Sequence, residues 1–296
     1  MLKIYGTPEE IYKLNTFNEI KQYCEQNNKQ IYDYVYETEG EEIKNFLGEI
    51  WEAMKESICF GLNAEGIIPG KLQLSKRAKS IYNNKIENEP TEVKRTRLLT
   101  AYAYAVSETN ASGGEIVTAP TCGSCGVLPA ALYYLQKEDK YTDEEIINAL
   151  ATAGIIGNIV KTNASISGAE CGCQAEIGTA CSMAAAACSQ LRKLDIYKIE
   201  HAAEIAMEHH LGLTCDPIYG YVQIPCIERN AVAAIRAIDA SNISMLLDEN
   251  QKISFDLITE TMYETGKDLR SHYRETSTGG LAKKYCRNKY YNTDME

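Results

Sequence analysis

The sequence predicts an all-α protein in which glycine-rich polar joints between helices form the functional site. Apolar residues recur at helical spacing over most of the chain. Strand signals are confined to residues 115–118 and 221–224, and neither stretch alternates over any length. No repeat or low-complexity linker divides the chain. We therefore expect an N-terminal helical extension over residues 1–45 and one principal domain, packed as a unit, over residues 46–296.

The first expected helices come from periodicity. The segment to about residue 40 is polar, tyrosine-rich and acidic, and we expect it to pack loosely. From Phe46 to Leu62 an apolar residue recurs at every fourth position, so one stripe should end at Gly61 and Gly66. Apolar residues also recur at helical spacing over residues 94–107, which predicts a helix there. A further helix should follow Gly126, with Pro129 as about its third residue.

The later helices have clearer start signals. Thr142 to Glu145 form a capping box that begins a helix running to Val160. Residues 175–191 are so rich in alanine that an isolated helix there would have little apolar area, so we place this helix centrally. Further helices are expected near residues 197–210, 227–247 and 255–265.

Composition limits the classes of partner. The chain has 296 residues, 45% of them hydrophobic and 24% charged, which is ordinary for a globular protein. Its net charge of −11 argues against nucleic acid or an anionic membrane as partner, because either would repel an acidic surface. We find no long apolar run and no signal-peptide pattern in residues 1–6. We therefore expect a cytoplasmic protein.

Eleven cysteines are the unusual component. Their odd number and the lack of an export signal argue against a disulfide framework. Cys24, Cys59 and Cys188 lie on helical stretches, where free cysteine is commonly a small hydrophobic residue. The chemistry is expected among the other eight, which are Cys122, Cys125, Cys171, Cys173, Cys181, Cys215, Cys226 and Cys286.

Three of these cysteines each lie in a polar segment that contains or borders a helix end. Cys173, Cys215 and Cys226 are separated by 42 and 11 residues, so they cannot share one short metal-binding loop. They could converge only through the fold. Three thiolates around a soft metal centre, with one position left over, is the arrangement that an open catalytic iron–sulfur cluster needs.

The joint at residues 112–126 has four glycines and several hydroxyls just before a helix. Backbone N–H groups in such a place can bind an anion, and the missing GxxxxGK[ST] lysine favours a small carboxylate over a nucleotide phosphate. On glycine content alone, a tight structural turn is equally well supported. The hydroxyls of Thr118, Thr121 and Ser124 favour binding.

Cys122 and Cys125 also form a CxxC pair. A thioredoxin-like motif is disfavoured because the βαβ context is missing. A structural zinc site formed by Cys122, Cys125, Cys171 and Cys173 remains a weaker alternative, since the Cys171–Cys173 pair lacks the usual turn-rich loop.

Two further joints are rich in polar residues. Residues 161–170 offer a lysine, an amide, hydroxyls and a carboxylate between two apolar helices, and buried polar groups of this kind need partners, which a substrate or a cluster would supply. In residues 208–217, His209 and His210 precede Cys215. A histidine at a helix end is more often a cap than a base, but here one of them could support a ligand.

Seven stretches of the chain resemble the catalytic, or α, chain of the iron–sulfur-dependent L-serine dehydratases. The resemblance runs from about Phe46 to Ala282 and is dense and ordered. The stretches that carry it are 113–121 (GGEIVTAPT), 163–170 (NASISGAE), 207–217 (MEHHLGLTCDP), 225–231 (PCIERNA), 260–268 (ETMYETGKD), 273–277 (YRETS) and 279–282 (GGLA).

This resemblance implies an all-helical catalytic domain that carries a [4Fe–4S] cluster on Cys173, Cys215 and Cys226. The implied reaction is the deaminating dehydration of L-serine to pyruvate and ammonia, with the unligated iron as Lewis acid on the β-hydroxyl. It further implies a small β domain, which we do not find in this sequence, so we expect a separate β subunit in a hetero-oligomer.

Site roles follow from the same resemblance and from the joints. The base is expected to be one of His209, Lys161 and Glu170, or to come from the β subunit. The serine carboxylate would lie against residues 113–121. The full set expected to bind substrate is Gly113, Gly114, Thr118, Thr121, Ser124, Asn163, Ser165 and Ser167.

Two cysteines depart from the pattern of the family, and two alternative functions remain open. Cys122 stands where several relatives have Asn or Ala. Some relatives end in a cysteine that folds back into the active site, whereas Cys286 lies near the end of this chain but is followed by ten more residues, which leaves such a role open. One alternative activity is β-elimination from L-cysteine or L-threonine. The other is a non-catalytic iron–sulfur sensor or scaffold, which would need the cysteine ligands but no anion-binding joint.

Overall fold

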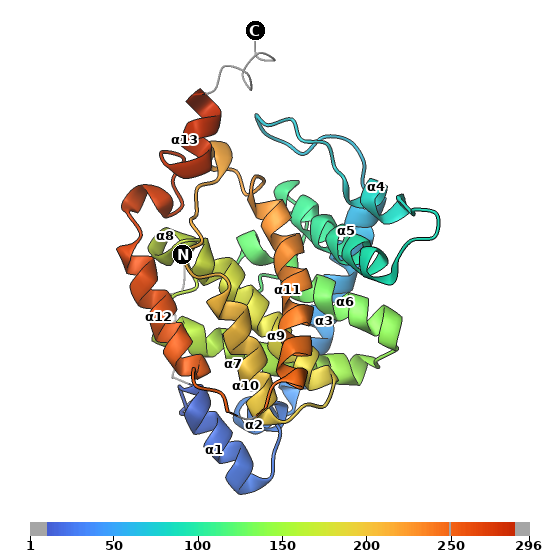
Figure 1. Ribbon diagram of the computed structural model, residues 1–296. Helices are drawn as coiled ribbons and strands as arrows, with labels where there is room; N and C mark the ends of the chain where they lie inside the picture. Colours follow the sequence, from blue (N-terminus) through green and yellow to red (C-terminus); the bar gives the residue numbers. More distant parts are fainter. Residues whose placement is uncertain (1–10, 249, 288–296) are drawn as a thin grey trace, which may run out of the picture.

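A computed structural model describes residues 11–248 and 250–287, and helices form every layer of it (Figure 1). Within these residues there is no β-strand, only two isolated bridges, and none of the helices is long and apolar enough to cross a membrane. The prediction of an all-α fold is confirmed.

The helices begin and end as follows: α1 (Phe17–Asn27), α2 (Ile31–Glu39), α3 (Glu42–Asn63), α4 (Ala78–Asn83), α5 (Thr91–Ala111), α6 (Val127–Asp139), α7 (Asp143–Asn163), α8 (Gly168–Cys171), α9 (Thr179–Leu191), α10 (Ile196–Glu208), α11 (Cys226–Leu246), α12 (Phe255–Asp268) and α13 (Gly280–Arg287). Shorter helical turns are η1 (Cys122–Ser124), η2 (Gln174–Gly178), η3 (Ile218–Gly220) and η4 (Ser271–Tyr273).

Helix α9 is the centre of the fold, and every one of its residues is buried. It packs against α6, α7, α10 and α11 (Figure 1). Small side chains let these helices approach closely, and polar atoms of α9 find backbone partners. Ser182 Oγ donates to the carbonyl of Ala203 in α10 at 2.7 Å, and Cys181 Sγ donates to the carbonyl of Ala233 in α11 at 3.3 Å. The predicted central position of the alanine-rich helix is confirmed.

Helix α3 differs in detail from the expected stripe. Met54 and Ile58 are buried, but Phe46 is 54% exposed and Trp51 takes a place on the buried face. A repeat of four residues drifts by about 40° per step around a helix of 3.6 residues per turn, so the ends of the stripe leave that face. The helix also continues through Gly61, where a Cβ would collide with the backbone of Ala105 in α5. Glycine there permits the close crossing of α3 and α5.

From residue 11 onward, where the structure describes it, the N-terminal segment packs against the core rather than loosely, and residues 1–10 lie outside the described residues. Thr16 and Glu19 form a capping box for α1, which buries Phe17 completely. The Phe17 ring meets that of Phe255 in α12 edge to face, with centroids 6.2 Å apart. Asp256 accepts the backbone N–H of Phe17 at 2.7 Å. A few apolar residues on one helical face therefore suffice to dock a segment whose overall composition is polar.

Candidate metal centre

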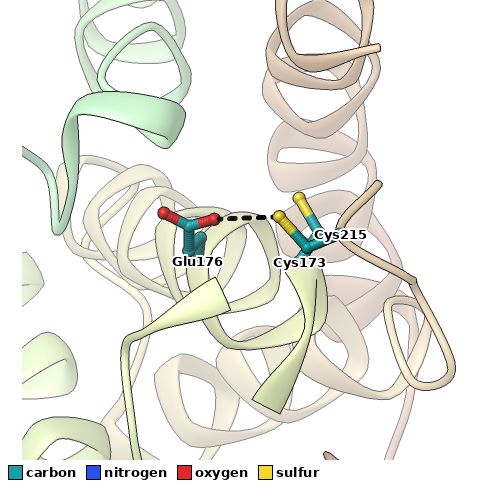
Figure 2. Close-up of side chains that lie close together, drawn as sticks. All are labelled: Cys173, Glu176 and Cys215. Atoms are coloured by element: carbon teal, nitrogen blue, oxygen red, sulfur yellow. Dashed lines mark hydrogen bonds between the residues drawn. The ribbon is translucent and has the colours of Figure 1, made fainter. Parts of the chain in front are cut away.

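Cys215 meets Cys173 and Glu176, which come from one short segment far from it in the sequence, in the interior. The sulfur atoms of Cys173 and Cys215 and a carboxylate oxygen of Glu176 all lie within 4.8 Å of one another. Figure 2 shows the two sulfurs side by side, with the carboxylate directed toward them. Cys226, the first residue of α11, contributes to raising the pKa of Cys215 but does not belong to this close group. All three thiols are buried.

A short π-helical turn positions Glu176. Cys173 is the residue before η2, and η2 leads directly into α9. Turns of this type are rare and frequently occur at functional sites, because the extra residue redirects a side chain. Here the turn directs Glu176 toward the thiols instead of into the packed surface of α9.

The side chain of Gln174 holds the segment that leads to Cys215 beside Cys173. Gln174 is completely buried, and its Oε1 accepts the backbone N–H of Gly212 at 2.7 Å. Its Nε2 donates to the carbonyl of Met262 in α12 at 2.7 Å. The N–H of Cys215 then donates to the carbonyl of Tyr273 at 2.8 Å. These bonds explain how the first two thiols, 42 residues apart, come together.

The side chain of Asn230 connects the third cysteine to the joint at residues 121–126. Its Oδ1 accepts the N–H of Gly126 at 2.8 Å, and its Nδ2 donates to the carbonyls of Gly123 and Cys226 at 2.8 and 2.9 Å. Asn230 is 1% exposed. One amide thus fixes the start of α11 relative to the glycine-bearing joint.

The pKa values of the three thiols are shifted in different directions. A hydrogen bond from Cys215 lowers the pKa of Cys173, with a smaller contribution from the Arg229 guanidinium, and the same bond together with burial raises the pKa of Cys215. Burial raises the pKa of Cys226 to about 12. Cys173 is therefore the thiol that most readily forms the thiolate, which is the form that binds metals.

Burial also raises the pKa of the Glu176 carboxyl, and a hydrogen bond from Thr121 partly opposes this shift. Its two oxygens have different partners. Oε1 accepts from the Thr121 hydroxyl at 2.8 Å, and Oε2 lies 3.9 Å from Cys215 Sγ.

The donor set fits a soft metal cluster. Three buried thiols are the ligands that iron–sulfur centres and other soft metals prefer. Gly168 borders the same space, since a Cβ there would collide with Glu176 Oε2 and lie 3.1 Å from Cys215 Sγ. Within the described residues, Cys173, Glu176 and Cys215 are the one group of three potential metal ligands with atoms so close together, and Cys226 is not part of it.

The residues of the first joint, 112–126, lie in different places in the structure. Thr121 and Ser124 reach the thiol site, because Thr121 bonds to Glu176 and its hydroxyl lies 3.2 Å from that of Ser124. Gly113 and Gly114 instead end α5, where their N–H groups donate to the carbonyls of Asn110 and Thr109. Thr118 is exposed.

The residues of the second joint, 161–170, also lie in different places. Lys161 is exposed in the last turn of α7, and the Asn163 amide donates to the carbonyls of Ile159 and Asn15. Ser165 is buried and accepts the N–H of Ser167 at 3.1 Å, just before α8.

Glu170, on α8, forms an ion pair of 2.5 Å with Lys267 of α12. The hydrogen bond from this lysine is the main reason that the pKa of Glu170 is lowered. Glu170 is thus held as a carboxylate on the side of α8 that faces α12, apart from the thiol–Glu176 group.

The two histidines of the third joint form hydrogen bonds at the end of α10. His209 Nδ1 lies 2.9 Å from the carbonyl of Ile205, and His210 Nδ1 lies 2.7 Å from that of Ala206. Burial lowers the pKa of His210, whereas His209 is exposed. His209 lines a hollow of about 390 Å³ together with Arg229 and Arg236.

The four cysteines of the alternative zinc site do not gather. Cys122 is exposed while Cys125 is buried in the core cluster, and Cys171 Sγ lies 4.0 Å from the carbonyl of Tyr263. Only Cys173 of that set belongs to the close group of ligands in the described residues. Cys286 lies on α13, where its side chain interacts with Tyr219.

Glu176 is the site residue that sequence reasoning missed. A signal for it does exist, because it is the one charged residue in the alanine-rich stretch from Ala175 to Leu191 and stands three residues after Cys173. A charged residue in a segment expected to be central needs a partner.

The all-helical fold encloses a buried group of thiols and a carboxylate, and this arrangement is compatible with a metal cluster. The chain belongs to the serine dehydratase alpha chain family, whose sequence model matches residues 10–282.

Similar proteins from three bacteria extend this finding. The chain is 45% identical to the L-serine dehydratase of Haemophilus influenzae over 284 residues, which cover 92% of this chain and 62% of that protein. It is 42% identical to L-serine dehydratase 2 of Escherichia coli over 292 residues (94% and 64%), and 43% identical to a Helicobacter pylori L-serine dehydratase over 289 residues (94% and 63%). The chain therefore spans a little under two thirds of the length of these relatives.

Proposed function

We propose that this chain is the cluster-binding catalytic part of an L-serine dehydratase, which converts L-serine to pyruvate and ammonia. The observation that carries the proposal is the meeting of Cys173 and Cys215 with Glu176 in a buried space. Membership of the serine dehydratase alpha chain family and the names of the similar proteins support the choice of reaction.

The proposed cofactor is a [4Fe–4S] cluster held by Cys173, Cys215 and Cys226. When bound, such a cluster supplies a Lewis-acidic iron that can activate the β-hydroxyl of serine as a leaving group. The chain's own contribution is to hold the thiols at the ends of three different segments and to keep water away from them, since all three side chains are at most 8% exposed.

We place the serine carboxylate along residues 113–121 and their neighbours at residues 163–168. Thr121 supports this placement because its hydroxyl bonds to Glu176, and the hydroxyl of Ser124 lies 3.2 Å from that of Thr121. A charge-assisted hydrogen bond from a hydroxyl or a backbone amide would orient the carboxylate. Gly113, Gly114 and Thr118 are exposed, although the N–H groups of the two glycines already donate to carbonyls at the end of α5. Asn163, Ser165 and Ser167 remain proposed contacts.

The base that removes the α-proton is proposed among His209, Lys161 and Glu170, or in a β subunit. His209 and Lys161 are exposed. The ion pair of Glu170 with Lys267 makes it the least suitable of the three, because a base must be free to accept a proton.

A separate β subunit in the cytoplasm is the proposed partner. The similar L-serine dehydratases are longer than this chain, which covers 62% of the Haemophilus influenzae protein. Leu246, at the end of α11, is 85% exposed and offers apolar surface for a contact. A reducing compartment would suit the thiols, since none of the eleven cysteines forms a disulfide.

The test is an assay of product release by the anaerobically reconstituted chain together with its partner subunit. We expect pyruvate from L-serine with a kcat/KM at least about tenfold above that for L-cysteine or the corresponding keto-acid release from L-threonine. A preference for L-cysteine or L-threonine would establish the alternative lyase. A stable cluster with no turnover of any of the three would establish the sensor or scaffold.

A further inference from the structure

We propose that Glu176 is a fourth protein ligand of the metal centre, and that in the absence of substrate its carboxylate binds the iron that the three thiols leave open. The inference rests on the proposed function, because it requires the cluster. It assigns a role to the one member of the close group of ligands that neither the sequence patterns nor the proposed reaction uses.

The position of the carboxylate is the first argument. Glu176 shares the 4.8 Å group with Cys173 and Cys215, and Figure 2 shows its carboxylate directed at the two sulfurs. Carboxylate oxygen is a common partner of thiolate and imidazole ligands at protein metal sites. A side chain from the same short segment as Cys173 thus reaches the place where the thiols supply no fourth ligand.

The two carboxylate oxygens divide their roles. Oε1 is held by the Thr121 hydroxyl at 2.8 Å. Oε2 is left facing the sulfur of Cys215, 3.9 Å away, with only a weak S–H donor as partner. When metal binding removes the thiol proton, Oε2 loses this donor and faces the metal instead. Thr121 is then the residue that orients the ligand, as outer hydrogen bonds do at other metal sites.

The burial of the charge is the second argument. A buried carboxylate requires a compensating positive charge or strong hydrogen bonds. Among the described residues no lysine or arginine forms an ion pair with Glu176, and the nearby Arg229 instead donates to the carbonyl of Thr214 at 2.6 Å and lies 3.8 Å from Asp216. A metal ion would supply the missing positive charge.

Glycines on both sides let the backbone pack closely against the carboxylate. A Cβ on Gly168 would collide with Oε2, and a Cβ on Gly123 would lie 3.2 Å from Oε1. In this proposal the substrate hydroxyl would displace the carboxylate from the iron, and the carboxylate would return when the product departs. This exchange of one oxygen ligand for another changes no oxidation state. Its consequence is that the resting centre keeps its fourth iron protected.

The test compares spectra of the substrate-free cluster in wild-type protein, Glu176→Gln and a matched control. Protein reconstituted anaerobically with ⁵⁷Fe is examined by Mössbauer spectroscopy, and the appearance of the [3Fe–4S] signal in air is followed by electron paramagnetic resonance. Glu204→Gln is the control, because Glu204 is also a buried glutamate but lies on α10 among Glu200, Glu208 and His201. Neither readout depends on turnover.

We expect Glu176→Gln to change the spectrum of one iron and to lose that iron about tenfold faster in air, the size of effect that changes around metal ligands typically have. Glu176→Asp, which keeps a carboxylate, should restore part of the protection. Glu204→Gln should match the wild type. If Glu176→Gln fails to fold, Thr121→Val, which removes only the hydroxyl that holds Oε1, should still perturb the same iron.

Identical spectra and rates of iron loss in wild type, Glu176→Gln and Thr121→Val would overturn the inference and leave the proposed function standing. A wild-type chain that assembles no cluster at all would overturn both. The two failures are thus distinguishable.

Discussion

The hydroxyl of Thr121 donates a 2.8 Å hydrogen bond to Oε1 of Glu176, 55 residues further along the chain. This bond joins two features that the sequence presents separately, the glycine-bearing joint before α6 and the cysteine segment before α9. It places Thr121, which belongs to the proposed substrate-binding segment 113–121, one hydrogen bond from the proposed metal centre. Several expectations for variants depend on this connection.

Replacing Thr121 with Ala should separate substrate positioning from cluster binding. We expect the cluster still to assemble anaerobically, with only the iron beside Glu176 perturbed, while kcat/KM falls by roughly 10- to 150-fold, the effect of losing one charge-assisted hydrogen bond worth about 1.5–3 kcal/mol. Steady-state kinetics with parallel iron analysis measures both properties. Thr118→Ala, at an exposed position of the same segment, should also retain its iron. Wild-type kinetics in both variants would show that residues 113–121 are only a turn.

Replacing Asn230 with Ala should destabilise the fold at the start of α11. The variant loses the acceptor for the N–H of Gly126 and donors to two carbonyls in a place that is 1% exposed. Leaving such buried groups unpaired costs about 1–3 kcal/mol each, so the free energy of unfolding should fall by at least about 2 kcal/mol. Denaturant titration of the metal-free protein measures this change. A loss below about 0.5 kcal/mol would contradict the role given to Asn230.

Replacing Gly168 with Ala should affect the metal centre more than the fold. The new methyl group would collide with Glu176 Oε2 and approach Cys215 Sγ. We expect metal content to fall while the far-ultraviolet circular dichroism stays helical. Gly154→Ala is the matched control, because a Cβ at Gly154 meets no atom within 4 Å. Equal iron contents in the two variants would show that Gly168 does not border the centre.

The raised pKa of Glu204 predicts that the free energy of unfolding depends on pH, whether or not a metal is bound. Burial raises its pKa from 4.5 to about 7, and the carboxylates of Glu208 and Glu200 add to the shift. Between these pH values the unfolded chain is ionised at this position while the folded chain holds a proton. The group therefore lowers stability as pH rises from 4.5 toward about 7 and keeps it lowered above that range.

Glu204→Gln should accordingly stabilise the protein at high pH and have little effect in acid. The gain near pH 8 should be about 1–3 kcal/mol, because one pKa unit corresponds to about 1.4 kcal/mol. Thermal or denaturant unfolding of both proteins at about pH 5 and about pH 8 provides the comparison. A gain of the same size at both pH values would mean that the burial of charge is not its cause.

Local patterns predicted most of the helices but less of the site. The capping box at Thr142 and the alanine content of residues 179–191 identify α7 and the central α9, because both signals act within one helix. Gly113 and Gly114 have the composition of an anion cradle, yet both end α5, and sequence cannot distinguish these uses of glycine. The position of the Glu176 carboxylate depends on a π-helical turn and on a hydrogen bond from Thr121. Neither the turn nor a contact between residues so far apart in the chain has a sequence signature.

The central claim is that Cys173, Cys215 and Cys226 together hold a metal cluster, and iron and sulfide analysis after anaerobic reconstitution tests it most directly. We expect about four iron ions and as many sulfides per wild-type chain, and loss of the cluster in each Cys→Ser variant at these positions. Cys24→Ser and Cys188→Ser, at buried positions in the helical core, should keep the full content. Full iron and sulfide in any one of the three ligand variants would contradict the account.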